Sequence, residues 1–107
     1  MPALEKLQEI AASFDPALNV ATAKWFGKPC LNSGKKVFVI LWGRDLVFKL
    51  AGDAHPQALQ ITGAHLFDPR GHGSPMKEWV QIPEAQAAAW GRFAVLACNN
   101  VSESSKQ

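Results

Sequence analysis

Hydrophobic residues near the N-terminus recur at the spacing of an α-helix. Apolar side chains stand at positions 4, 7, 10, 11 and 14, and charged or amide side chains fill most positions between them. This spacing places the apolar side chains in one stripe along a helix. Because the residue before Pro16 is pushed out of the α conformation, the pattern predicts a helix over residues 4–14.

Between residues 22 and 50 the hydrophobic period changes to two. The middle of this region is apolar on both faces of a strand, with Val37, Val39 and Leu41 on one face and Phe38, Ile40 and Trp42 on the other. Such a strand is typical of the centre of a sheet. Turn-forming residues separate it from its neighbours and predict a meander of three antiparallel strands, at residues 22–32, 36–42 and 46–50.

The second half of the chain mixes helices and strands. We expect a helix over 51–61, strands at 65–67 and 78–82, a loop over 68–75, and a last helix from Pro83 to Cys98. The order α-β-β-β-α-β-β-α predicts a two-layer α+β fold, with helices packed on an antiparallel sheet of about five strands. We expect one domain over residues 1–101 and a flexible, serine-rich tail over 102–107.

The composition is that of a folded globular chain. Hydrophobic residues make up 48% of the 107 residues, which excludes disorder over most of the length. No apolar run approaches the ~20 residues that a membrane helix needs. The first residues lack the basic segment and apolar block of a signal peptide, so we expect a cytoplasmic protein without a membrane partner.

Five short motifs resemble those of one protein family. Residues 24–31, Lys-Trp-Phe-Gly-Lys-Pro-Cys-Leu, resemble the Arg-Met-Phe-Gly-x-Pro-Cys stretch of the TfoX N-terminal-domain family. Segments that resemble other motifs of this family follow in the same order, at residues 34–38, 46–50, 63–69 and 74–80. Trp25 and Trp79 stand where the family usually has methionine and tyrosine, and both changes keep an apolar side chain.

The resemblance covers residues 20–97 and implies a compact α+β domain with an antiparallel sheet. The related YjbR family shares the Phe-Gly-x-Pro stretch and the same general fold. The resemblance implies no catalytic residues. Full TfoX proteins are competence regulators with a second, C-terminal domain, so a role that resides in that domain is not implied for this chain.

Residues that could carry catalysis or bind a metal form no recognisable pattern. His55, His65 and His72 lie too far apart in the sequence for the close pairs that zinc sites use. Cys30 has no cysteine-enzyme signature around it, and we expect it to be a small buried hydrophobe. Because no nucleophile elbow or glycine-rich phosphate loop occurs either, we expect no catalytic residue, no metal, no cofactor and no enzyme activity.

The charged residues are unevenly distributed, although the net charge is only +2. The predicted meander carries one acid, Asp45, and six basic residues: Lys24, Lys28, Lys35, Lys36, Arg44 and Lys49. Its net charge is therefore +5, whereas five basic and eight acidic residues give the remainder −3. Strand alternation predicts that Lys24 and Lys28 point to the same side.

This distribution favours a small non-catalytic binding or regulatory domain. The basic meander and its aromatic residues would contact nucleic acid, by phosphate neutralisation and stacking, or an acidic protein partner. The alternative without a binding function is that the lysines prevent an exposed sheet edge from associating with another copy of the chain.

Two other functions remain open at this point. The two-sided apolar strand over residues 36–42 would also suit a homodimeric protein-interaction module. The other open function is the binding of a small molecule in a pocket between the sheet and the helices. Aromatic residues would form the floor of this pocket: Trp25, Phe38, Trp42 and Trp79.

Overall fold

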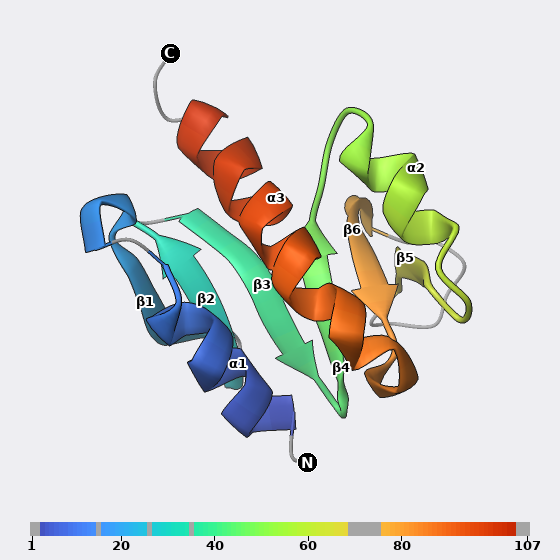
Figure 1. The fold of residues 1–107 in the computed structure, drawn as a ribbon, viewed down its shortest axis with the longest axis horizontal. Coiled ribbons are helices and arrows are strands. Elements are labelled where there is room, and N and C mark those ends of the chain that lie inside the picture. The colour runs from blue at the N-terminus through green and yellow to red at the C-terminus, as the bar shows by residue number, and fades with distance from the viewer. Residues whose placement is uncertain (1–2, 15, 26, 35, 69–75, 105–107) are drawn as a thin grey trace.

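The structure, a computed structural model, describes residues 3–14, 16–25, 27–34, 36–68 and 76–104. It confirms the α+β class: helices pack on one face of an antiparallel sheet (Figure 1). The sheet has six strands, one more than expected, in the order β1-β2-β3-β4-β6-β5. No helix in the described ranges is long and apolar enough to cross a membrane.

The elements follow one another along the chain as helices (α), 3₁₀ helices (η) and strands (β). They are α1 (Ala3–Ala12), η1 (Pro16–Leu18), β1 (Val20–Trp25), β2 (Lys28–Ser33), β3 (Lys36–Trp42), β4 (Asp45–Lys49), α2 (Ala54–Leu59), β5 (His65–Phe67), β6 (Met76–Ile82), η2 (Glu84–Ala89) and α3 (Trp90–Ser104).

The region predicted as a single strand over residues 22–32 is a hairpin of two strands. Trp25 pairs with Lys28, and Gly27 between them has a φ of +79°, a conformation that glycine adopts at little cost. Because neighbouring residues on a strand point to opposite faces, Lys24 lies on the face opposite to Trp25 and Lys28. The prediction that Lys24 and Lys28 point to the same side is therefore wrong. It treats these residues as part of one continuous strand, whereas the chain turns at Gly27 between them.

A β-bulge changes the phase of β3. Leu31 pairs with Val39 and Asn32 with Val37, so Phe38 has no residue opposite it. A bulge inserts one extra residue into a strand and shifts the alternation beyond it. Phe38 and Val39 consequently both belong to the core under the helices, and the predicted grouping of Phe38 with Ile40 and Trp42 is wrong.

The main core lies between the sheet and the helices. α1 contributes Leu7 and Ile10, while a stripe along α3 begins with the fully buried Trp90 and Phe93. The indole Nε1 of Trp90 donates a hydrogen bond to the Ile82 carbonyl oxygen (3.1 Å), so the buried ring leaves no polar atom unsatisfied. Each large apolar side chain buried here contributes about 1.5–3 kcal/mol.

The last helix begins and ends later than expected, because Glu84–Ala89 form the 3₁₀ helix η2 and α3 starts at Trp90. α3 continues past Cys98 to Ser104, because the buried Val101 extends its apolar stripe by another turn. Asn100 Nδ2 donates to the Lys49 carbonyl oxygen (3.3 Å) and fixes this turn to the end of β4. The predicted tail over 102–107 thus begins inside the helix, and residues 105–107 lie outside the described ranges.

A second, smaller core lies on the other face of the sheet, which we call the open face. Its members all come from strands: Cys30, Ile40, Val47, Phe67 and Trp79, with Ala23, Trp25, Val37 and Trp42 packed against them. α1, α2 and α3 lie on the opposite side (Figure 1). On the open face, therefore, none of the described helices covers the apolar residues of the sheet.

The open face of the sheet as a candidate binding site

The basic residues of the predicted meander do not gather on one face. Lys28 and Lys49 lie on the open face, because their partners in the register, Trp25 and Trp79, belong to its core. Lys24 and Lys36 each come directly before a residue of the open face, Trp25 and Val37. Because neighbouring residues on a strand point to opposite faces, both lysines point to the helix side. The other two differ: Arg44 is exposed in the turn between β3 and β4, and Lys35 lies outside the described residues.

Three of the four predicted aromatic site residues share the open face. Trp25 and Trp42 are half-buried there, and Trp79 is 9% exposed. Phe38 is separated from them by the sheet and packs edge to face against Phe14, with ring centroids 5.7 Å apart. The structure thus brings together the tryptophans and excludes the phenylalanine, which the bulge turns toward the helices.

A cation and two aromatic rings form a row across the open face. Lys28 Nζ lies 5.3 Å from the ring centroid of Trp42, within the range of a cation–π contact. On its other side Trp42 meets Phe67 edge to face, at a centroid distance of 5.0 Å. The row therefore runs from β2 through β3 to β5.

Asp45, which pairs with Trp42 in the register, has its carboxylate already engaged. Asp45 accepts hydrogen bonds from Gln81 Nε2 (2.7 Å) and from the Glu84 backbone N–H (3.0 Å). Its negative charge is thereby directed toward the start of η2, a helix end that favours an anion.

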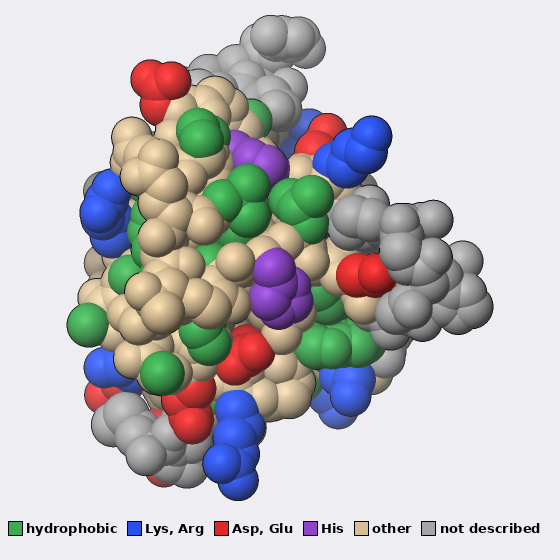
Figure 2. All heavy atoms as spheres, turned by 90° about the vertical axis from the view of Figure 1, so that its right-hand side faces the viewer, with side chains coloured by type: hydrophobic (Ala, Val, Ile, Leu, Met, Phe, Trp, Pro, Cys, Tyr) green, Lys and Arg blue, Asp and Glu red, His purple; other side chains and the backbone are tan. Residues whose placement is uncertain are grey.

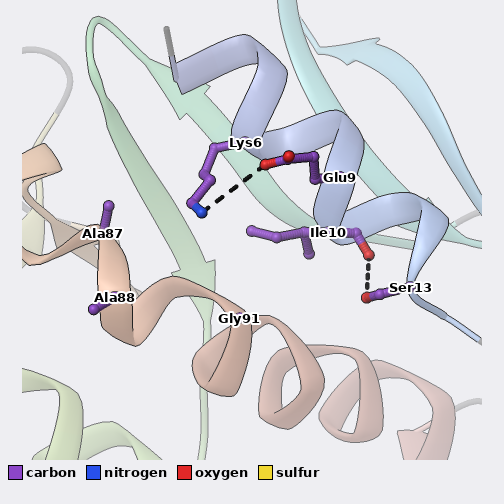
Figure 3. Close-up of a pocket in the computed structure, with 7 residues that line it drawn as sticks. All are labelled: Lys6, Glu9, Ile10, Ser13, Ala87, Ala88 and Gly91. Atoms are coloured by element: carbon purple, nitrogen blue, oxygen red, sulfur yellow. Dashed lines mark hydrogen bonds and ion pairs between the residues drawn. The ribbon is translucent and has the colours of Figure 1, made fainter. Parts of the chain in front are cut away.

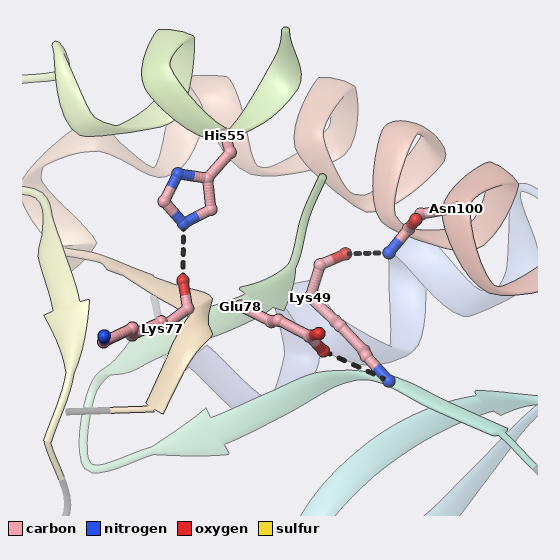
Figure 4. Close-up of polar contacts among 5 residues, drawn as sticks. All are labelled: Lys49, His55, Lys77, Glu78 and Asn100. Carbon is pink, nitrogen blue, oxygen red and sulfur yellow. Dashed lines mark hydrogen bonds and ion pairs between the residues drawn. The ribbon is translucent and has the colours of Figure 1, made fainter. Parts of the chain in front are cut away.

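Lys49, the second cation of the open face, is paired with a carboxylate. Lys49 Nζ is 3.7 Å from a Glu78 carboxylate oxygen, and both side chains are partly exposed (Figure 4). A surface pair of this kind contributes little to stability, so Lys49 can exchange Glu78 for another anion at small cost.

Cys30 lies in the middle of the open face but is not suited to nucleophilic chemistry. Its side chain is fully buried among the strands, and this burial raises the pKa of the thiol. A raised pKa keeps the sulfur in the unreactive protonated form at neutral pH. The structure thus agrees with the reading of Cys30 as a buried apolar residue.

The described histidines do not form a metal site. His55 Nε2 is 2.6 Å from the Lys77 carbonyl oxygen (Figure 4), and His65 Nδ1 is 2.9 Å from the Leu66 carbonyl oxygen. Within the described part of the chain, no three His, Cys, Asp or Glu residues are grouped so as to hold a metal. Basic and acidic side chains are mixed on the side of the molecule drawn in Figure 2, where histidines lie in separate places. His72 lies outside the described residues.

A shallow hollow lies between α1 and the start of α3, on the helix side of the molecule. Its volume is about 270 Å³, and Lys6, Glu9, Ile10 and Ser13 line one wall (Figure 3). The opposite wall is made of Ala87, Ala88 and Gly91. Pockets for small ligands typically enclose about 300–1,000 Å³ and have aromatic walls. The hollow lacks aromatic walls and contains none of the residues singled out from the sequence.

Comparisons with protein-family models, with curated proteins and with solved structures found no match to this chain. The resemblance to the TfoX N-terminal domains accordingly stays a prediction. Sequence reasoning missed Phe67 as a member of the site, because no local signal reveals that β5 approaches β3.

Proposed function

We propose that this domain is a non-catalytic module that binds single-stranded nucleic acid on the open face of its sheet. The observation that carries the proposal is the position of Lys28 over the ring of Trp42, on a face that no helix of the described chain covers. Trp25 pairs with Lys28 on the same face, so a second indole lies beside this cation. Aromatic groups and lysines side by side on a sheet suit bases and phosphates respectively.

A single strand fits this face better than a duplex. The bases of a single strand can turn outward and stack on an indole, whereas duplex bases are already stacked on one another. Trp42 and Phe67 meet on this face, so it offers aromatic rings on a sheet rather than a projecting helix or ribbon for a groove. The proposal therefore rests on two basic residues of this face, Lys28 and Lys49, and not on all six of the meander.

An acidic protein partner is the competing candidate, and one titration separates the two. Fluorescence anisotropy of a labelled oligothymidylate at low salt should report binding that weakens as salt is added, because counterions are released from the phosphates. An oligoglutamate peptide of similar charge should displace it poorly, since it has no bases to stack. Displacement of the oligothymidylate by the peptide at equal charge concentration would favour an acidic protein as the partner. If the anisotropy of the oligothymidylate does not change at all, the nucleic-acid proposal is refuted.

The cytoplasmic location and the regulatory role stay predictions from the sequence. Both are compatible with a small nucleic-acid-binding domain. Localisation of a tagged full-length chain by fluorescence microscopy tests the first of them. The regulatory role is tested by whether the chain changes gene expression and whether that change is lost when Lys28 or Trp25 is substituted.

A further inference from the structure

The two edges of the sheet are protected to very different degrees. β5 is three residues long, and its pairing with β6 is irregular between Leu66 and Phe67. A short, irregular strand makes a poor template for another chain. β1 has six residues in an unbroken register with β2, and no strand of the described chain pairs with its outer side. β1 is therefore the edge that is free to pair.

The helix beside this edge presents an uncharged flank to it. α1 packs over β1 and β2, and the side of α1 toward α3 carries Lys6 and Glu9. Helical spacing places Leu4, Gln8 and Ala11 on the opposite flank, toward the β1 edge. Leu4 is 42% exposed and is one of the two large apolar side chains exposed in the described residues. An apolar helix flank beside a free strand edge is typical of an interface.

We propose that two copies of this chain pair through β1, in antiparallel fashion, to form one continuous sheet. The occupant of the edge is a second copy because the strand is complementary to itself. Every register centred on a residue keeps equivalent faces together, and those centred on Thr22 and Ala23 pair the largest part of the strand. The register centred on Lys24 opposes two lysines directly, which is unfavourable. The register centred on Thr22 sets Trp25 against Asn19, which precedes the strand and has a φ of 54°.

The register centred on Ala23 avoids both problems. It sets the small Ala21 opposite Trp25 of the other copy on the open face. On the helix side it sets Thr22 opposite Lys24 of the other copy, so that no like charges meet. The two-fold axis is perpendicular to the sheet, and both α1 flanks with Leu4 therefore lie on the same face of the dimer and approach one another.

This pairing joins the two open faces into a single surface, with the two copies of Trp25 on either side of the axis. Dimerisation does not depend on the proposed nucleic-acid binding, because the edge contacts involve β1 and α1 alone. Failure of one proposal therefore leaves the other standing. Sedimentation-velocity measurements on the full chain, without nucleic acid, test the dimer by itself.

Two substitutions of the exposed Thr22 test the register. Thr22→Lys places two lysines opposite one another and should weaken association about tenfold, whereas Thr22→Glu places a carboxylate opposite Lys24 and should preserve or strengthen it. Thr22 is exposed, so neither change disturbs the fold of one copy. Equal effects of the two changes would overturn the register centred on Ala23.

The helix flank is tested with a matched pair of exposed apolar residues. Leu4→Lys should shift the wild-type dimer toward the 11.6 kDa monomer, while Val95→Lys on α3, where Val95 is 47% exposed, should leave the dimer intact. Circular dichroism verifies that both variants are folded. A wild-type chain that sediments as a monomer up to millimolar concentration would overturn the proposal, as would a dimer unaffected by Leu4→Lys and Thr22→Lys.

Discussion

The indole of Trp42 and the ring of Phe67 meet edge to face at 5.0 Å, although their strands are three places apart in the sheet. Adjacent strands are about 4.8 Å apart, so β3 and β5 would be separated by roughly 14 Å in a flat sheet. The two side chains therefore reach toward one another across the open face, over β4 and β6. Both belong to the second apolar core, whose described members all come from strands.

The aromatic contact should be measurable as a coupling between the two residues. Phe67 is fully buried, and Phe67→Ala should lower the free energy of unfolding by about 3–5 kcal/mol. A double-mutant cycle of Trp42→Leu and Phe67→Leu should yield a coupling of about 0.5–1.5 kcal/mol. Urea unfolding followed by circular dichroism provides these values, and a coupling near zero would contradict the contact between the two rings.

Asp45 should stabilise the fold through its hydrogen bonds to Gln81 and to the start of η2. Asp45→Ala leaves the Glu84 N–H without this acceptor and should cost about 1–2 kcal/mol. Asp53 precedes α2 in the same way but makes no side-chain cap. Asp53→Ala should therefore change the stability by less than about 0.5 kcal/mol. Similar losses in the two variants would argue against the cross-element cap.

Replacement by alanine should have opposite effects on stability at two glycines, one in the hairpin turn and one in the last helix. Gly27 has a φ of +79°, so Gly27→Ala should destabilise the chain by about 1 kcal/mol despite the open space around it. Gly91 lies in α3 with no atom near its missing Cβ, and Gly91→Ala should stabilise by up to about 1 kcal/mol. Thermal unfolding compares the two variants with the wild type. Melting temperatures that shift in the same direction would contradict the turn conformation of Gly27.

Burial of Cys30 should make the stability of the fold depend on alkaline pH. Burial raises the pKa of this thiol above its ordinary value of 9.0, so the folded chain keeps a proton that the unfolded chain releases. Stability from this group is present below that pH and falls as the pH rises through it. The difference in unfolding free energy between wild type and Cys30→Ala should shrink above pH 9.0. A constant difference would indicate an exposed thiol.

Local patterns predicted the elements well where alternation or helical spacing is unbroken. The amphipathic helix α1 and the strand β3 lie where the patterns place them, since each signal is contained within one element. The patterns failed where a backbone feature resets the phase. Gly27 turns the chain inside an apparently continuous strand, and the bulge at Phe38 moves one aromatic residue to the other face.

The candidate site could be predicted only in part for the same reason. Trp25, Trp42 and Trp79 were identified as aromatic residues of a sheet, and they do share a face. The grouping of the lysines could not be derived, because Lys24 and Lys28 look alike in sequence until the turn between them is known. The contribution of Phe67 depends on a contact between strands that are far apart in the sequence.

The binding of single-stranded nucleic acid to the open face is tested most directly by comparing two lysines of one hairpin. Lys28 and Lys24 are both exposed but lie on opposite faces. Oligothymidylate affinity is measured for Lys28→Ala and Lys24→Ala over a series of salt concentrations. Lys28→Ala alone should weaken binding and reduce the slope of log affinity against log salt by about 0.7, as expected for one phosphate contact. Equal losses in the two variants would contradict the account.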